Sequence, residues 1–193
     1  DYTQKGGKVQ TIEKFRKAVA DTTGSVLTYQ GELIEATYFS CSGGRTEDAL
    51  AVWGTDVPYL QAVDSPGEEN ATHYTDQIKM TAKEFVSKLG VELQGTPASW
   101  FGKVTYTPGG GVDTIMIGGI PFRGVELRQK LNLYSTAFSI MAAGENVHIF
   151  TKGFGHRVGM SQYGADAMAV NGSTYQEILI HYYPGTTLSS YLD

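Results

Sequence analysis

The sequence is short of the features that mark several large classes of protein. It has one cysteine in 193 residues, so it cannot form an internal disulfide, and its redox compartment stays open. It contains no run of 18 apolar residues and no signal-peptide pattern. Asp and Glu outnumber Lys and Arg by 20 to 15, and no basic run occurs. This balance argues against nucleic acid as a partner.

Glycine and tyrosine, in contrast, are abundant. The chain has 24 Gly and 12 Tyr, with 41% hydrophobic and 18% charged residues. The last two values are ordinary for a soluble globular domain, and the length is sufficient for one domain with a real core. The glycines predict many turns and close backbone approaches. Aromatic rings on such a surface suit sugar faces, although most of them are expected in the core.

The hydrophobic patterns predict an α+β fold: a hairpin-rich mixed fold with several short helices, in one domain that could be bilobed. Capping residues, with Thr81, Ser161 and Thr174 as N-caps, and apolar spacing predict helices at 11–20, 81–89, 125–131, 161–170 and from 174 to before Pro184. Strands are expected at 26–29 and 32–39, at 104–107, 114–117 and 120–122, and at 137–142 and 146–151.

Small polar residues follow a predicted strand in residues 40–47, the first motif segment. Its candidate binding residues are Ser40, Cys41, Ser42, Gly43, Arg45 and Glu47. Hydroxyls and backbone amides at such a strand end can bind sugar hydroxyls. The alternative is a plain strand-end turn. Cys41 invites a nucleophile hypothesis, which would need a nearby base such as His156 or His181, against the simpler interpretation of a buried, inert residue.

Four glycines surround one histidine in residues 153–165, the second motif segment. Ser161 is placed to cap the next helix, and Gln162 and Tyr163 follow at that helix's N-terminus, where polar groups can converge on a ligand. His156 and these three residues are therefore binding candidates. The alternative for His156 is a structural histidine that bonds a loop carbonyl. The segment lacks the Gly-Lys-Ser/Thr of a phosphate loop.

The histidine spacing does not favour a metal site. None of the four histidines pair at i+3 or i+4, and neither HExxH nor CxxC occurs. Ser161 is not in a nucleophile elbow, because Tyr163 stands where that pattern needs glycine. No cofactor is predicted.

Several motifs in order carry a family resemblance that runs from about Thr22 to Thr186. They are residues 24–29, 35–39, 42–47, 52–54, 58–63, 156–165 and 177–186. With these motifs the chain resembles the stage II sporulation protein D family, which also includes amidase-enhancer proteins. Residues 1–193 are interpreted as the C-terminal major part of such a domain.

The resemblance implies a peptidoglycan lytic transglycosylase. Its substrate class is glycan strands, especially strands stripped of stem peptides. A glutamate protonates the glycosidic oxygen, and the 6-hydroxyl of muramic acid closes onto C1 to give a 1,6-anhydro end. Hydrolases, in contrast, use two carboxylates. The acid needs a raised pKa, and therefore an apolar setting.

The sequence departs from the family pattern at the catalytic position. The family's glutamate lies in a segment like "EMP…ALKAQAVAARTY", which these residues lack, so the catalytic residue is unknown here and is expected upstream of Asp1. Glu47 is interpreted as a groove or loop-bracing residue, with direct chemistry as the alternative. Cys41 replaces the threonine of the family's Ser-Thr-Ser and is a variant site residue, or a metal ligand with upstream partners.

Two functions and one alternative without activity follow from these observations. The first is an enzyme to which this chain contributes the groove. The second is a non-catalytic peptidoglycan-binding module that stimulates a cell-wall amidase. The third is a fragment without activity alone. The resemblance implies an extracytoplasmic, cell-wall-facing location, with membrane contact only through an N-terminal anchor absent from these residues.

Overall fold

The computed structural model describes residues 9–191, and its contacts divide the chain into two compact units. One unit joins Asp1–Ile34 with Thr186–Asp193, and the other is Glu35–Gly185. Within the described residues there are helices and several small sheets, in no βαβ alternation. The α+β prediction is confirmed. No helix in the described part of the chain combines the length and apolarity that a membrane crossing requires.

The first unit contains one helix and a three-stranded antiparallel sheet. These elements are α1 (Val9–Asp21), β1 (Ser25–Tyr29), β2 (Glu32–Leu33) and β11 (Thr187–Ser190), with strand order β11-β1-β2. The predicted helix is confirmed, and so is the tight turn implied between the predicted strands 26–29 and 32–39: its residues Gln30 and Gly31 both have positive φ, as the commonest two-residue hairpin turn requires. The second strand of the hairpin is shorter than predicted, ending at Leu33.

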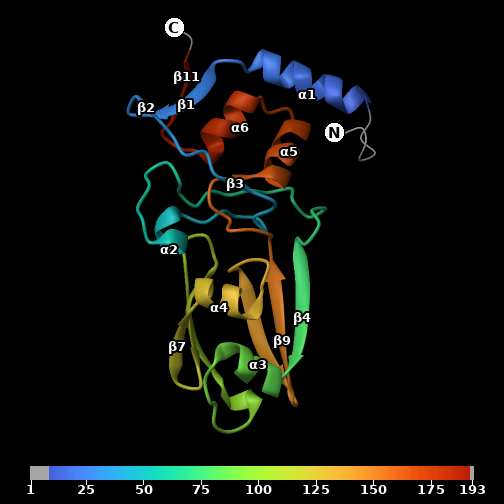
Figure 1. Cartoon of the computed structure of the whole chain (residues 1–193), viewed down its shortest axis with the longest axis vertical. Coiled ribbons are helices and arrows are strands. Elements are labelled where there is room, and N and C mark those ends of the chain that lie inside the picture. Colours follow the sequence, from blue (N-terminus) through green and yellow to red (C-terminus); the bar gives the residue numbers. More distant parts are fainter. Residues whose placement is uncertain (1–8, 192–193) are drawn as a thin grey trace. The chain divides into compact units, whose positions relative to one another are not determined.

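The second unit carries the remaining elements (Figure 1). Its sheets have the orders β4-β9-β8, β5-β6-β7 and β10-β3. Its strands are β3 (Tyr38–Phe39), β4 (Thr75–Thr81), β5 (Phe101–Tyr106), β6 (Val112–Ile117), β7 (Ile120–Arg123), β8 (Phe138–Ala143), β9 (Asn146–Lys152) and β10 (Met160–Ser161). Its α-helices are α2 (Ala49–Trp53), α3 (Ala82–Leu89), α4 (Gly124–Leu131), α5 (Gln162–Val170) and α6 (Tyr175–Tyr182), with a 3₁₀ turn at Pro97–Ser99.

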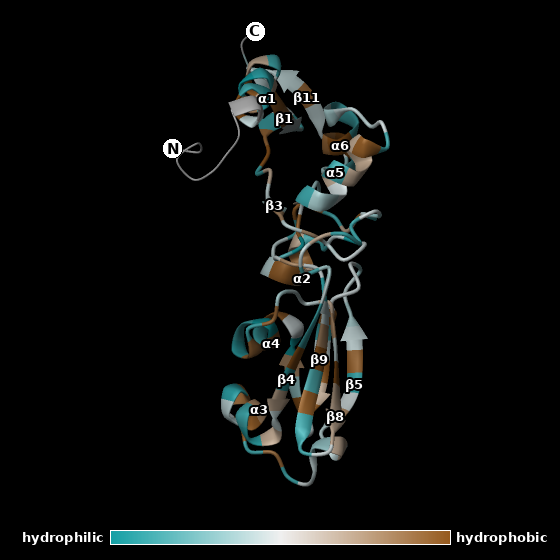
Figure 2. Ribbon diagram, turned by 90° about the vertical axis from the view of Figure 1, so that its right-hand side faces the viewer, coloured by the Kyte–Doolittle hydropathy of each residue, from teal (hydrophilic) through white to brown (hydrophobic). Residues whose placement is uncertain are grey.

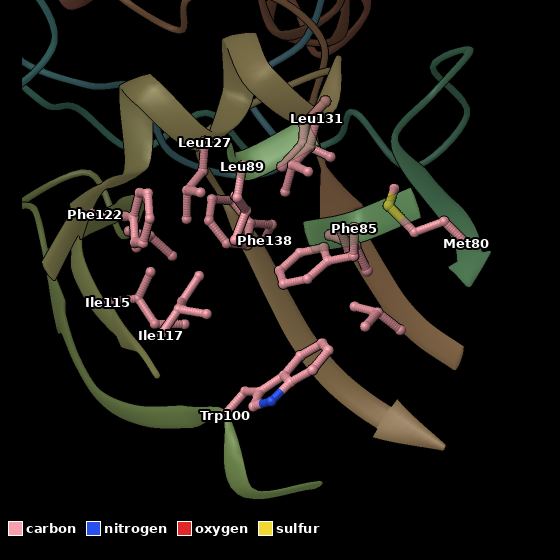
Figure 3. Packing of buried hydrophobic residues seen from close by; sticks show 14 residues of the cluster. Met80, Phe85, Leu89, Trp100, Ile115, Ile117, Phe122, Leu127, Leu131 and Phe138 are labelled. Carbon is pink, nitrogen blue, oxygen red and sulfur yellow. The ribbon is translucent and has the colours of Figure 1, made fainter. Parts of the chain in front are cut away.

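An apolar core joins α3 and α4 to the strands beside them. Both helices lie on one side of strands β4, β9 and β8 (Figure 2). Phe85 and Leu89 of α3 are fully buried, as the sequence predicts, and they meet Leu127 of α4 and Phe138 of β8 (Figure 3). Burial of an aliphatic or aromatic side chain contributes about 1.5–3 kcal/mol, so this cluster is a main source of stability for the second unit.

Helix caps confirm the predicted helix starts. Thr81, Ser161 and Thr174 each accept a hydrogen bond from the backbone N–H three residues on. Thr174 and Glu177 form a complete capping box. Several elements were missed, among them β10, β11, α2, which has only five residues, and β4, which alternates polar residues with a few apolar ones. A helix this short has too little periodicity to detect.

Candidate functional site

The two motif segments, far apart in sequence, lie side by side in the second unit. Strand β3 leads into the first motif segment, and β10 lies within the second. The two strands pair in parallel. Cys41 and Phe154 then exchange two backbone hydrogen bonds of 3.2 and 2.8 Å. The Tyr163 N–H donates to the Ser40 carbonyl at 3.1 Å, and the Glu47 N–H donates to the Arg157 carbonyl at 2.6 Å. One continuous structure thus contains both segments.

A buried arginine ties the segments together. The Arg157 side chain donates to the carbonyl oxygens of Ser42 at 2.7 Å, Arg45 at 2.7 Å and Gly109 at 2.8 Å. It also forms a buried ion pair with Glu47, at 3.1 Å between Nη1 and Oε1. Burial lowers the pKa of Arg157, and the negative charges of Glu47 and Glu68 oppose this shift. Satisfied donors on one planar guanidinium suit this bracing role.

Glu47 is fully buried and joins the first motif segment to the turn after β5. Its Oε1 accepts from Thr107 Oγ1 and from the Gly111 N–H, both at 2.9 Å, as well as from Arg157. Its Oε2 is buried without a hydrogen-bond partner. Gly111 packs so closely that an added Cβ would collide with the carboxylate. The loop-bracing interpretation of Glu47 therefore describes its place in the structure.

A second buried carboxylate, Glu68, organises the other side of the first segment. Its Oε2 accepts from the N–H groups of Ser42, Gly43 and Gly44 at 2.8–3.2 Å and from the Ser42 hydroxyl at 2.7 Å. Its Oε1 accepts from the hydroxyls of Ser65 and Ser161. Successive backbone N–H groups that converge on one anion form an anion-binding concavity, filled here by a side chain of the same protein.

Four predicted binding residues are consequently not exposed. Cys41, Ser42, Glu47 and Ser161 are all fully buried, so their side chains do not form an open surface. Burial, together with the nearby Glu68 charge, raises the pKa of the Cys41 thiol, which disfavours the thiolate that a nucleophile requires. Cys41 fits the description of a small inert residue. Ser161 accepts from the Gly164 N–H as the α5 cap, and it bonds Glu68.

His156 is half-buried, and the backbone holds its ring. Its Nδ1 accepts from the Val158 N–H at 3.1 Å, and the ring also bonds the backbone of Tyr38. Burial lowers its pKa, so the imidazole is neutral at pH 7. The ring contacts Trp53, with ring centroids 5.4 Å apart, and Phe39, at 5.6 Å. The contacts of His156 with Trp53 and Phe39 are therefore made by its ring.

The remaining candidates reach the surface. Ser40, Gly43 and Arg45 are half-buried, while Gln162 and Tyr163 are exposed at the start of α5. Arg45 is held by Asp64 and by the Pro108 carbonyl. Trp53, 46% exposed at the end of α2, adds an aromatic ring beside His156. We define Ser40, Trp53, His156 and Tyr163 as the aromatic surface.

Three parts of this arrangement escaped the sequence analysis. Glu68 is in a Ser-Pro-Gly-Glu-Glu stretch that looks like an exposed turn. The glycine-rich turn at 108–111, which joins the predicted strands 104–107 and 114–117, also contacts Glu47 and Arg157. Trp53 belongs to one of the family motifs but was not chosen as a site residue. The signal for the turn was its run of three glycines, more than a hairpin requires.

Similarity to curated proteins agrees with the resemblance. No protein-family model matches the chain. The chain is 45% identical over 179 residues to stage II sporulation protein D of Bacillus subtilis (strain 168), an alignment that covers 92% of the chain and 52% of that protein. The chain belongs to the stage II sporulation protein D family.

Two further relatives extend this picture. Stage II sporulation protein D of Bacillus amyloliquefaciens is 43% identical over 93% of the chain and 52% of that protein. The "Amidase enhancer" of Bacillus subtilis (strain 168) is 30% identical over 91% of the chain and 32% of its own length. The chain spans about half the length of the curated sporulation-protein-D relatives that it matches.

Proposed function

We propose that a protein carrying this chain cleaves peptidoglycan glycan strands as a lytic transglycosylase, in cell-wall remodelling such as sporulation engulfment. It acts from an extracytoplasmic position on strands stripped of stem peptides. The name of the relatives at 45% and 43% identity supports the role in sporulation. The aromatic surface contributes to the groove that holds the glycan, and a glutamate from outside these residues protonates the glycosidic oxygen.

One structural observation carries this proposal. The two motif segments converge, although their members Ser42 and Arg157 are 115 residues apart in sequence. Together they bury both glutamates of the site and leave aromatic rings and small polar groups exposed. Glu47 and Glu68 are buried and hydrogen-bonded to other groups of the protein, so neither carboxyl reaches a surface where it could meet a glycosidic oxygen. The contrast between buried glutamates and exposed rings supports a role in which this chain holds the substrate and the catalytic acid comes from outside these residues.

The test is product analysis on denuded glycan strands with the full-length protein. We expect sugars with 1,6-anhydro ends, identified by mass spectrometry. A Trp53→Ala variant should release them more slowly because the aromatic surface loses a ring. Reducing ends without anhydro products would indicate hydrolysis. If neither kind of product formed, the result would contradict catalysis altogether.

The relative named an amidase enhancer favours a second candidate, a peptidoglycan-binding module that stimulates a cell-wall amidase. This alternative needs the same glycan-binding surface but no acid. It predicts that the chain raises the rate of stem-peptide release by a purified amidase, and that Trp53→Ala reduces this stimulation. Stimulation without anhydro products would favour the module over the enzyme.

A further inference from the structure

The three-stranded sheet β4-β9-β8 has one face in the core and one face open to solvent. Burial alternates along each strand: Ile149 is fully buried, whereas its neighbour Phe150 is 41% exposed. The register places Gln77, Phe150 and Ser139 opposite one another across the three strands. Cross-strand partners point to the same side of a sheet, so these three side chains share the open face.

A hollow of about 720 Å³ lies over these strands, a volume in the range of small-molecule sites. Its lining includes Asp76, Gln77, Ser139, Phe150 and Lys152. An exposed phenyl ring between an amide and a hydroxyl is suited to a sugar, since the ring covers the apolar C–H face and the polar groups bond the hydroxyls.

The strand residues that point to this open face include lysines but no carboxylate. By the alternation of burial these lysines are Lys79 and Lys152. Asp76 also lines the hollow, from the opposite side of β4, and its carboxylate is already bonded to His73 Nδ1 at 2.6 Å and to the Gln77 N–H at 3.0 Å. Although the whole chain has a net charge of −5, this face favours an anionic ligand.

Lys152 is the cation that lines the hollow. Its ammonium lies 5.3 Å from the centre of the Tyr74 ring, and it forms no ion pair within the described residues. Lys152 also borders the motif segments. It precedes Gly153, and a Cβ added to Gly43 would lie 2.9 Å from the Lys152 carbonyl carbon. The hollow thus adjoins the first motif segment.

We propose that this hollow binds an N-acetylated sugar that bears a free carboxylate, with Lys152 pairing with the carboxylate and Phe150 covering the sugar face. This inference rests on the proposed function, in which the ligand is a glycan strand stripped of stem peptides. Removal of the peptide frees the lactyl carboxylate of muramic acid. Lys152 is then the residue that distinguishes a stripped strand from one whose carboxylates are blocked by amide bonds.

Calorimetric titration of the 193-residue chain tests this proposal with three tetrasaccharides. The first alternates N-acetylglucosamine with muramic acid and has free lactyl carboxylates, the second has those carboxylates amidated, and the third is chitotetraose. We expect the free acid to bind about fivefold more tightly than the amide, as one partly exposed ion pair allows. Added salt should reduce this preference.

Two substitutions locate the preference. Lys152→Gln should bind the acid and the amide equally, and Phe150→Ala should weaken binding of all three sugars. Lys83→Gln, which removes an exposed lysine of α3 outside the hollow, is the matched control and should bind like the wild type.

Each other outcome overturns a definite claim. Equal binding of the acid and the amide by the wild-type chain, or a preference that survives in Lys152→Gln, would reject the carboxylate site while leaving the proposed function intact. If Lys83→Gln lost the preference for the acid as fully as Lys152→Gln does, the preference would come from general charge attraction, which would also reject the site. No affinity for any of the three sugars would count against the proposed function itself.

Discussion

The second unit is held together in two different ways. Around α3, α4 and the strands beside them, stability comes from apolar side chains such as Phe85 and Leu127. Around the motif segments it comes from two buried carboxylates and one buried arginine, Glu47, Glu68 and Arg157. Apolar packing tolerates changes that keep volume, whereas a buried charge requires particular partners. The polar region is therefore expected to fix loop conformations more strictly than the apolar core does.

The largest expected effect is the loss of the buried arginine. Arg157→Leu leaves Glu47 buried without its cation and frees the carbonyls of Ser42 and Gly109, so we expect a loss of about 3–5 kcal/mol in the free energy of unfolding. Urea unfolding measures it. Arg157→Lys keeps the charge but not the forked geometry, so its free energy of unfolding should lie between those of the wild type and Arg157→Leu. A loss below about 1 kcal/mol in Arg157→Leu would contradict the bracing role.

The next effect compares two substitutions that preserve volume, one in each region. Glu68→Gln replaces acceptor capacity with an amide NH₂ that cannot accept the converging N–H groups and hydroxyls, and we expect it to cost about 1–3 kcal/mol. Leu127→Met in the apolar core should cost less than about 1.5 kcal/mol. Chemical denaturation of both variants under one condition makes the comparison. A larger cost for Leu127→Met would reverse the contrast between the regions.

A smaller effect is expected from His156 as the pH falls. Burial lowers the pKa of His156, so the unfolded chain takes up a proton before the folded one. The stability contribution of the neutral ring is complete above the unfolded pKa of about 6.5 and is lost as the pH falls from there through the lower folded pKa.

The check is a pair of urea titrations at pH 7.5 and at pH 5.5. Wild-type protein should lose more stability between the two pH values than His156→Gln, which cannot titrate at this position. Identical losses would show that His156 is not the group responsible.

Much of the fold could be predicted from the sequence because its signals are local. The caps at Thr81, Ser161 and Thr174 and the turn at Gln30-Gly31 depend on neighbouring residues alone. Strand β4 was missed because its side chains on the open face are polar, and the 32–39 strand was extended too far because the partner of residues 38–39 is more than 100 residues away, in β10.

The site was harder to predict for the same reason. The two motif segments lie side by side in the structure, but the sequence could not show which of their side chains point inward. Ser42 and Glu47 look like polar surface residues until Glu68 and Arg157 are placed beside them. The exposure of a side chain depends on residues far away in the sequence. For the same reason the exposed ring of Trp53 was not selected as a site residue.

Glycan binding by the aromatic surface is the central claim, and a titration of denuded tetrasaccharide into wild-type and Trp53→Ala protein tests it most directly. Because Trp53 is at the surface, its loss should change the free energy of unfolding by about 1 kcal/mol or less. We predict that affinity nonetheless falls about tenfold, as expected for an aromatic anchor. Equal affinity in the two proteins, with stability unchanged, would contradict the account.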